Sequence, residues 1–290
     1  MSDPESVHAL ADAGASYAQA GDTVEECRLM LLTARALVVA QQEQTAQEIL
    51  SEAMDCARRE PRLALEWRLA RACCGHPETV TLLRDVLEGL PSPVRDHDRI
   101  LAGTTLGMAL LHGSDVAGAR EVLEAALQLA QQHDDPAWTC KVSSLLGNLL
   151  LEQGLPAEAE PLLDIAIRAA DRCDDDLTLV AEGTILTAVQ VGRQDWTAAL
   201  ATSRLLALAA ERRENWLGVV DACITQSSCL RELGELEQAL RVLLNAAGDL
   251  RARGSEASVN LLKARLAELR SQIGPEAFDP IWKNVIRTPQ

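Results

Sequence analysis

The side chains whose types could do chemistry are few, and their spacing favours structural roles. Cys73, Cys74 and His76 form the densest group of metal-ligating types. Adjacent cysteines on a helix point about 100° apart, and the neighbouring sequence offers no evident fourth ligand for zinc. The acidic run at 174–176 could attract calcium, but helix capping and the helix dipole explain it adequately. We therefore predict no metal site and no cofactor.

Short motifs of common catalytic sites are also missing. The sequence contains no glycine loop that would hold a phosphate, no Gly-x-Ser-x-Gly and no His-Glu-x-x-His. The five histidines lie near expected helix ends or turns, where exposure or capping of a helix C-terminus accounts for them. These absences predict that the chain is not an enzyme.

Composition and charge restrict the partners and the compartment. With 27 basic and 43 acidic residues the net charge is −16, which repels phosphate backbones and anionic lipids, so we predict neither nucleic acid nor membrane as a partner. No stretch of about 18 uncharged apolar residues occurs, and the eight cysteines include no Cys-x-x-Cys pair. We expect a soluble, cytoplasmic protein with reduced thiols. Its arginine-rich, lysine-poor usage is typical of GC-rich bacterial genomes.

The elements that must position a binding site are helices, and they repeat. Small residues stand early in alternate helices at Ala119, Ala159, Ala199 and Ala239, a constant step of 40 (159 − 119, 199 − 159, 239 − 199). Ala46 and Val80 extend this series towards the N-terminus with steps of 34 and 39. A fixed period in this range is typical of a solenoid. Aromatic residues are only 2% of the chain, which also favours an all-α fold.

Turn and cap residues divide this pattern into segments. We expect a first helix over 5–20 within an N-terminal cap (1–26), six repeats over 27–253, and capping helices within 254–290. A Pro-bounded connector at 90–98 is a candidate hinge, after which the array over 99–253 is regular. The predicted helices that follow the first are 24–40, 44–59, 61–74, 78–89, 99–112, 115–132, 136–152, 156–172, 176–191, 195–212, 215–232, 235–252, 256–272 and 276–286.

The repeat resembles the tetratricopeptide repeat, in the longer variety of bacterial signalling proteins, kinesin light chains and Rap-type peptide receptors. Leu146-Gly147 is followed twelve residues after the glycine by Ala159 and seven later by Ala166, and the same pattern occurs 40 residues earlier. The resemblance covers 27–253 and implies a right-handed α-α superhelical solenoid. We expect Gly147 to face Ala159 where the paired helices cross. The sequence departs from the pattern at Thr187, Ser203, Leu206 and Ser227.

The resemblance further implies a concave groove, lined by the first helix of each pair, that binds segments of other proteins. Lys141 and Asn148 are too isolated for the clamp that chaperone adaptors use on a terminal carboxylate. An Asn148 amide could instead read a peptide backbone, or it could be a solvated surface residue. The corresponding positions are Thr104, Met108, Ser144, Asn148, Thr184, Ala188, Ile224 and Ser228, with Lys141, Glu152, Gln190, Asp221 and Arg231 nearby.

These observations predict a non-catalytic adaptor that binds another protein or a peptide. The alternatives are a sensor of the Rap type, which would close around a small peptide or other ligand with the 90–98 connector as the hinge, and a secretion-type chaperone. Near the C-terminus, Phe278 and Trp282 form an apolar pair on one helical face. The pair would either dock on the array or contact a partner, which includes homodimer formation through the terminal helices.

Overall fold

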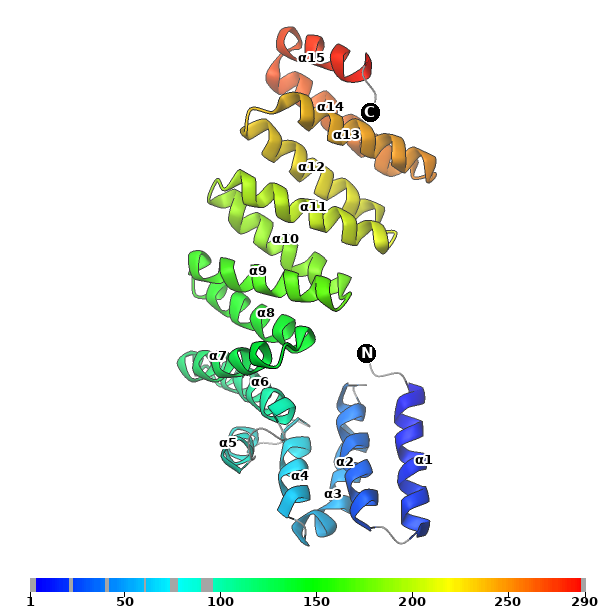
Figure 1. Ribbon diagram of the computed structural model, residues 1–290, viewed down its shortest axis with the longest axis vertical. Coiled ribbons are helices and arrows are strands. Elements are labelled where there is room, and N and C mark those ends of the chain that lie inside the picture. Colours follow the sequence, from blue (N-terminus) through cyan, green and yellow to red (C-terminus); the bar gives the residue numbers. More distant parts are fainter. Residues whose placement is uncertain are drawn as a thin grey trace. The chain divides into compact units, whose positions relative to one another are not determined.

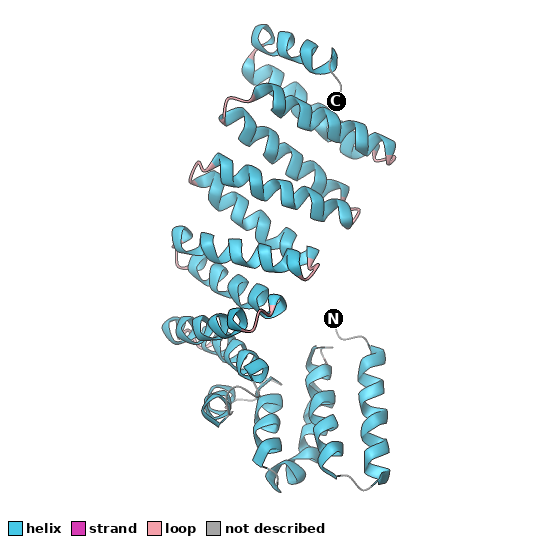
Figure 2. Cartoon of the chain, viewed as in Figure 1, coloured by secondary structure: helices cyan, strands magenta, loops and turns pink. Residues whose placement is uncertain are grey.

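The computed structural model describes residues 4–20, 23–39, 42–59, 61–73, 78–89 and 96–287, and within these ranges the chain is helical with no strand (Figures 1 and 2). The chain divides into two compact units, one ending at His133 and one beginning at Asp134. The first unit holds α1 (Pro4–Ala20), α2 (Thr23–Val39), α3 (Glu43–Arg59), α4 (Pro61–Cys73), α5 (Thr79–Gly89), α6 (Asp96–His112) and α7 (Val116–Gln132). The second holds α8 (Pro136–Glu152), α9 (Pro156–Arg172), α10 (Asp176–Gly192), α11 (Trp196–Arg212), α12 (Trp216–Glu232), α13 (Leu236–Ala252), α14 (Glu256–Ile273) and α15 (Pro275–Arg287).

Within each unit, successive helices pack side by side as hairpins, which confirms the all-α repeat architecture (Figure 1). The largest error in the predicted helix bounds is at α6, which begins at Asp96 rather than at residue 99. Three residues assigned to the connector at 90–98 are therefore helical, and 90–95 lie outside the described residues, as do Cys74, Gly75 and His76. No helix in the described ranges has both the length and the apolar character that a membrane span requires.

Turns of three residues separate helices of 17 residues from α6 to α13, so one helix and one turn occupy 20 residues. A residue with positive φ stands in every turn of this series, at Ser114, Asp134, Gly154, Asp174, Gln194, Glu214, Gly234 and, before α14, Gly254. This backbone conformation is easy for glycine and strained for other residues. Half of the 40-residue sequence period is therefore one helix with its turn.

These turns use two local solutions. Where the positive-φ residue is not glycine, the next residue is Asp or Asn, and its side chain accepts a hydrogen bond from a backbone N–H at 3.0–3.1 Å. Where it is glycine, as at Gly154 and Gly234, the cap residue makes no such bond. A residue at an N-cap that accepts this bond satisfies one free N–H of the first helical turn. The strained turns are therefore also the capped ones.

The paired helices approach closely where a glycine faces a leucine. A Cβ atom on Gly147 would lie 2.8 Å from Leu163, and one on Gly107 would lie 2.5 Å from Leu123. The expectation that Gly147 faces Ala159 is therefore wrong, because Leu163 occupies the space that a side chain at 147 would need. The small residue admits the leucine of the partner helix into the crossing, and overpacking is costly at such a contact.

The hairpin α10/α11 keeps this arrangement with the residues moved by one helical turn. Thr187 and Ser203 stand where α8/α9 has Gly147 and Leu163. Gly183 instead provides the space, and a Cβ atom there would lie 2.7 Å from Leu206. The departures from the sequence pattern thus compensate one another.

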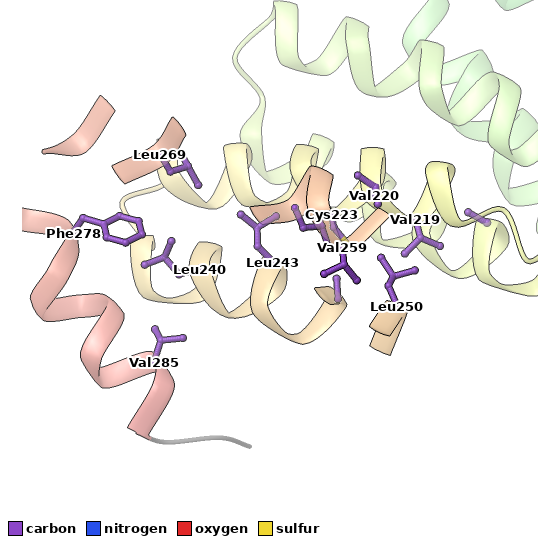
Figure 3. Packing of buried hydrophobic residues seen from close by; sticks show 13 residues of the cluster. Val219, Val220, Cys223, Leu240, Leu243, Leu250, Val259, Leu269, Phe278 and Val285 are labelled. Atoms are coloured by element: carbon purple, nitrogen blue, oxygen red, sulfur yellow. The ribbon is translucent and has the colours of Figure 1, made fainter. Parts of the chain in front are cut away.

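The C-terminal helix docks on the second unit. Phe278 is 3% exposed and belongs to a buried cluster with Leu240 and Val285, and in Figure 3 its ring points toward Leu240. Trp282 stacks on Phe278 with ring centroids 5.9 Å apart and packs against the same cluster. Of the two readings of this pair, docking on the array is the one observed. The side chains that suggested homodimer formation are used within the chain.

Candidate binding groove

The predicted groove residues of the first unit are not equally accessible. Thr104 is 1% exposed, and its hydroxyl donates to the Ile100 carbonyl at 2.7 Å. Met108 on the same helix is half-buried. The Thr104 hydroxyl is therefore buried and already bonded within its own helix, and the predicted residues other than Thr104 and Met108 all lie in the second unit.

A cavity of about 460 Å³ opens between α10 and α12 in the second unit. We call it the α10–α12 cavity. The predicted residues Thr184 and Ala188 line it from α10, facing Asp221 and Thr225 of α12. Apart from Asp221 its lining side chains are uncharged, so it has the form of a pocket for a few apolar side chains.

Exposed leucines stand at the start of α10 and α12, the two helices between which this cavity opens. Leu217 lines it and is 60% exposed, and Leu177, 40 residues earlier at the start of α10, is 62% exposed. Both occupy the second position of their helices. Two large apolar side chains thus remain in water at equivalent places on α10 and α12, each the first helix of its pair.

On the other side of α12, the helix α14 covers two further predicted residues. Arg265 of α14 donates from Nη2 to Ser228 Oγ at 2.9 Å, and Arg231 donates from Nη1 to Gln272 Oε1 at 2.7 Å. Ile224 is half-buried against the C-terminal core. Ser228 and Arg231 are thus bonded to α14, whereas Thr184, Ala188 and Asp221 remain exposed.

A buried carboxylate lies between α8 and α10. Glu182 is 8% exposed and accepts from Asn148 Nδ2 at 3.3 and 3.4 Å. Burial raises the pKa of Glu182, while the Asn148 amide and the Ser144 hydroxyl oppose this shift. Ser144 Oγ is itself buried and, among the described residues, has no hydrogen bond of normal geometry. Ser144, Asn148 and Glu182 thus form one polar cluster, which we call the Glu182 cluster.

Sequence reasoning identified two members of this cluster and missed Glu182. The positions 40 residues before and after it are Val142 and Ala222, both buried. A single charged residue in an otherwise apolar column was the signal that could have found it. The sequence-based groove instead followed only the columns of Ser144 and Asn148.

The surroundings of the Glu182 cluster are acidic. Burial raises the pKa of the Cys140 thiol to about 12, and the nearby Asp175 and Glu182 add to this shift. Lys141, the predicted groove cation, is exposed, and its Nζ lies over the Trp138 ring, 5.2 Å from the centroid. Cys140 and Cys173 are free thiols, and no three His, Cys, Asp or Glu side chains in the described ranges group as a metal site.

No family model matches the chain, and no curated protein matches its sequence. Solved structures do match. A STAND signal-transduction ATPase with a tetratricopeptide repeat sensor, PH0952 from Pyrococcus horikoshii, superposes with a TM-score of 0.59 at 11% identity over 89% of this chain and 44% of its own. The apo form of RapI gives 0.55 at 11% identity over 84% of this chain and 72% of that one.

A third match is BtubC (BKLC) from P. vanneervenii, with a TM-score of 0.50 at 15% identity over 80% of this chain and 92% of that one. The chain spans less than half the length of PH0952. These similarities show a tetratricopeptide-like helical-repeat fold.

Proposed function

We propose that this chain is a non-catalytic adaptor that binds a segment of another protein in the groove formed by α8, α10 and α12. The α10–α12 cavity carries the proposal. Its volume of about 460 Å³ lies in the range of ligand pockets, roughly 300–1,000 Å³. Thr184 and Ala188 on one wall leave room for an incoming side chain.

The surface around the cavity supports a protein segment as the ligand. Leu177 and Leu217 are exposed at equivalent positions, and neighbouring apolar side chains left in water commonly mark a protein contact. Asp221 gives the cavity wall one carboxylate. A segment with alternating apolar and polar side chains could contact both kinds of surface. The net charge of −16 favours a neutral or basic partner.

A second candidate is a sensor of a short peptide, which the small size of the cavity favours. One cavity of this volume accommodates a few side chains rather than the surface of a folded partner. PH0952 is described as carrying a tetratricopeptide repeat sensor, so a similar fold is assigned to sensing in that protein. Capture of ligands on the full chain, followed by intact-mass analysis, separates a protein ligand from a peptide.

The substitution Ala188→Arg tests the groove because its side chain would fill the α10–α12 cavity. Ala201→Arg is the matched control, since Ala201 is exposed on α11 and does not line the cavity. We expect A188R to abolish retention of ligands that the wild-type chain captures, and A201R to retain them. Equal retention by both variants, at unchanged helical content, would remove the groove from the proposal.

A further inference from the structure

We propose that the Glu182 cluster is a binding site for the side-chain ammonium of a lysine in the bound segment. This inference rests on the proposed function and specifies which residue the segment must contain. Three observations support it: the burial of the carboxylate, the positions of the nearby cations and the number of available acceptor oxygens.

The position of Glu182 requires an explanation because it opposes folding. Its side chain is 8% exposed in a column where the neighbouring repeats have Val142 and Ala222. A buried carboxylate is costly unless a cation or several hydrogen bonds compensate it. The hydrogen bonds from Asn148, at 3.3 and 3.4 Å, are long and come from a neutral donor.

Five cations of the surrounding hairpins are engaged elsewhere. Lys141 lies on the Trp138 ring. Arg172 donates to Asp134 at 2.8 Å, and Arg212 donates from Nε to Asp176 at 2.9 Å. Arg168 pairs with Asp164, and Arg193 pairs with Glu160. Among the described residues, no cation contributes to the electrostatics of Glu182, so the carboxylate has no internal counter-ion.

The oxygen atoms of the cluster match an ammonium group in number. Ser144 Oγ is buried without a hydrogen-bond partner among the described residues, although it is close enough to favour the charged form of Glu182. The Asn148 amide uses its nitrogen on Glu182, which leaves its oxygen as an acceptor. Together with the carboxylate, these are three acceptors for the three N–H donors of a lysine.

Lysine also fits the restricted access better than arginine does. Ser144 and Glu182 are each 8% exposed, so a ligand must reach their side-chain oxygens past the side chains that cover them. A lysine ends in a compact group on a slender aliphatic stem, whereas a guanidinium is a wide planar fork. The exposed Leu177 on the same helix would then face the apolar part of the segment.

The test uses immobilised full-length protein and two pools of short acetylated and amidated peptides. Both pools vary in aliphatic residues and serine, and each peptide of the first contains one lysine. Norleucine replaces this lysine in the second pool, which removes the charge and retains the stem. We expect the wild-type chain to bind the lysine pool about tenfold more tightly or better.

The variant Glu182→Gln removes the charge while retaining the size of the side chain. We expect it to bind the lysine pool as weakly as the norleucine pool, with binding of norleucine peptides unchanged. Ser144→Ala, a smaller change, should reduce the preference for lysine a few-fold. Two further pools test other cations: an unacetylated norleucine pool, which carries a terminal ammonium, and an arginine pool. Both should bind as weakly as the acetylated norleucine pool. Tighter binding of either by the wild type would overturn the assignment to a lysine side chain.

Further outcomes separate this inference from the proposed function. Equal binding of the lysine and norleucine pools, sensitive to A188R, would overturn the lysine site and leave the groove intact. Equal weakening of both pools by E182Q would assign a structural role to Glu182 and also overturn the site. Failure of the wild-type chain to bind any pool would contradict both proposals.

Discussion

The hairpins α8/α9 and α10/α11 share one backbone arrangement. Three differences between their side chains are informative: those at the crossing, at the turn and at one buried charge. The crossing in α8/α9 uses Gly147 with Leu163, whereas α10/α11 uses Gly183 with Leu206. The turn in α8/α9 uses Gly154, whereas α10/α11 has a non-glycine residue followed by a capping Asp195. The comparison shows that the fold constrains the sum of the volumes at a crossing rather than the residue at each position.

A buried charge is the third difference. Glu182 on α10 replaces the apolar Val142 of α8, and no compensating change supplies a cation within the described residues. The first two differences are neutral exchanges between equivalent structural solutions. The third adds a cost without a structural benefit, which is the reason for assigning it to binding.

The largest effect is expected when a single crossing residue of α10/α11 is introduced into α8/α9 without its compensating partners. Gly147→Thr should destabilise the chain by about 3 kcal/mol, because the new side chain would overlap Leu163. Thermal unfolding followed by circular dichroism measures this loss.

The matched control transfers the complete set of crossing residues from α10/α11 into α8/α9. The four changes Ser143→Gly, Gly147→Thr, Leu163→Ser and Ala166→Leu reproduce positions 183, 187, 203 and 206. We expect the fourfold variant to recover most of the stability that Gly147→Thr loses, because contacting residues couple strongly. A fourfold variant no more stable than the single one would contradict the compensation.

A smaller effect is expected at the two turns. Asp195→Ala should cost about 1 kcal/mol, because Ala198 N–H would lose the hydrogen bond that it donates to the cap at 3.0 Å. The converse change, Leu155→Asp, supplies the missing cap at the start of α9 and should gain about 0.5 kcal/mol. Chemical unfolding of both variants measures these shifts. If the two changes had the same sign, the turns would not be the alternatives described above.

The smallest effect is expected for the change in stability caused by Glu182→Gln. Asn148 and Ser144 already offset part of the free-energy cost of burying the carboxylate. The pKa of Glu182 is raised above its ordinary value of 4.5, so the folded chain holds this proton more tightly than the unfolded chain does. The tighter binding of this proton therefore stabilises the folded chain fully below pH 4.5. This stabilisation is lost as pH rises through the raised pKa. Relative to wild type, E182Q should be more stable at neutral pH.

Melting temperatures of both proteins across this pH range test the sign. The advantage of E182Q should disappear as pH falls below about 4.5, near the ordinary glutamate value. The Cys140 thiol on α8 interacts with this carboxylate, with Cys173 and with Asp175, and these three other groups are present in both proteins. An advantage that persisted in acid would reflect packing rather than charge.

Most helix positions could be predicted from the sequence because local signals determine them. The repeated small residues, the turn glycines and the acidic caps recur at fixed spacing, and each has a local physical role. The predicted start of α6 is three residues late, because the prolines at 91 and 93 are turn signals whose effect ends before Asp96. Asp96 and Asp98 lie in its first turn, where acidic residues are favoured by the helix dipole.

The candidate groove could be predicted only in part because accessibility depends on distant elements. Thr184 and Ala188 line the α10–α12 cavity, and their role in binding stays a prediction. The bonding of Ser228 to Arg265 depends on how α14 packs, which the repeat pattern does not determine. Likewise, the contact between Asn148 and Glu182 joins residues 34 apart in sequence. The relation of this carboxylate to Asn148 follows only from the three-dimensional contact between α8 and α10.

The constant length of one helix with its turn has a consequence at the level of the gene. Positive-φ residues occur every 20 positions from Ser114 to Gly254. An in-frame duplication or loss of 40 codons between equivalent turns therefore adds or removes one complete hairpin. Every cap and every turn outside that stretch retains its place in the pattern. The number of inner helices available for binding can change by whole steps through recombination, without redesign of any connecting loop.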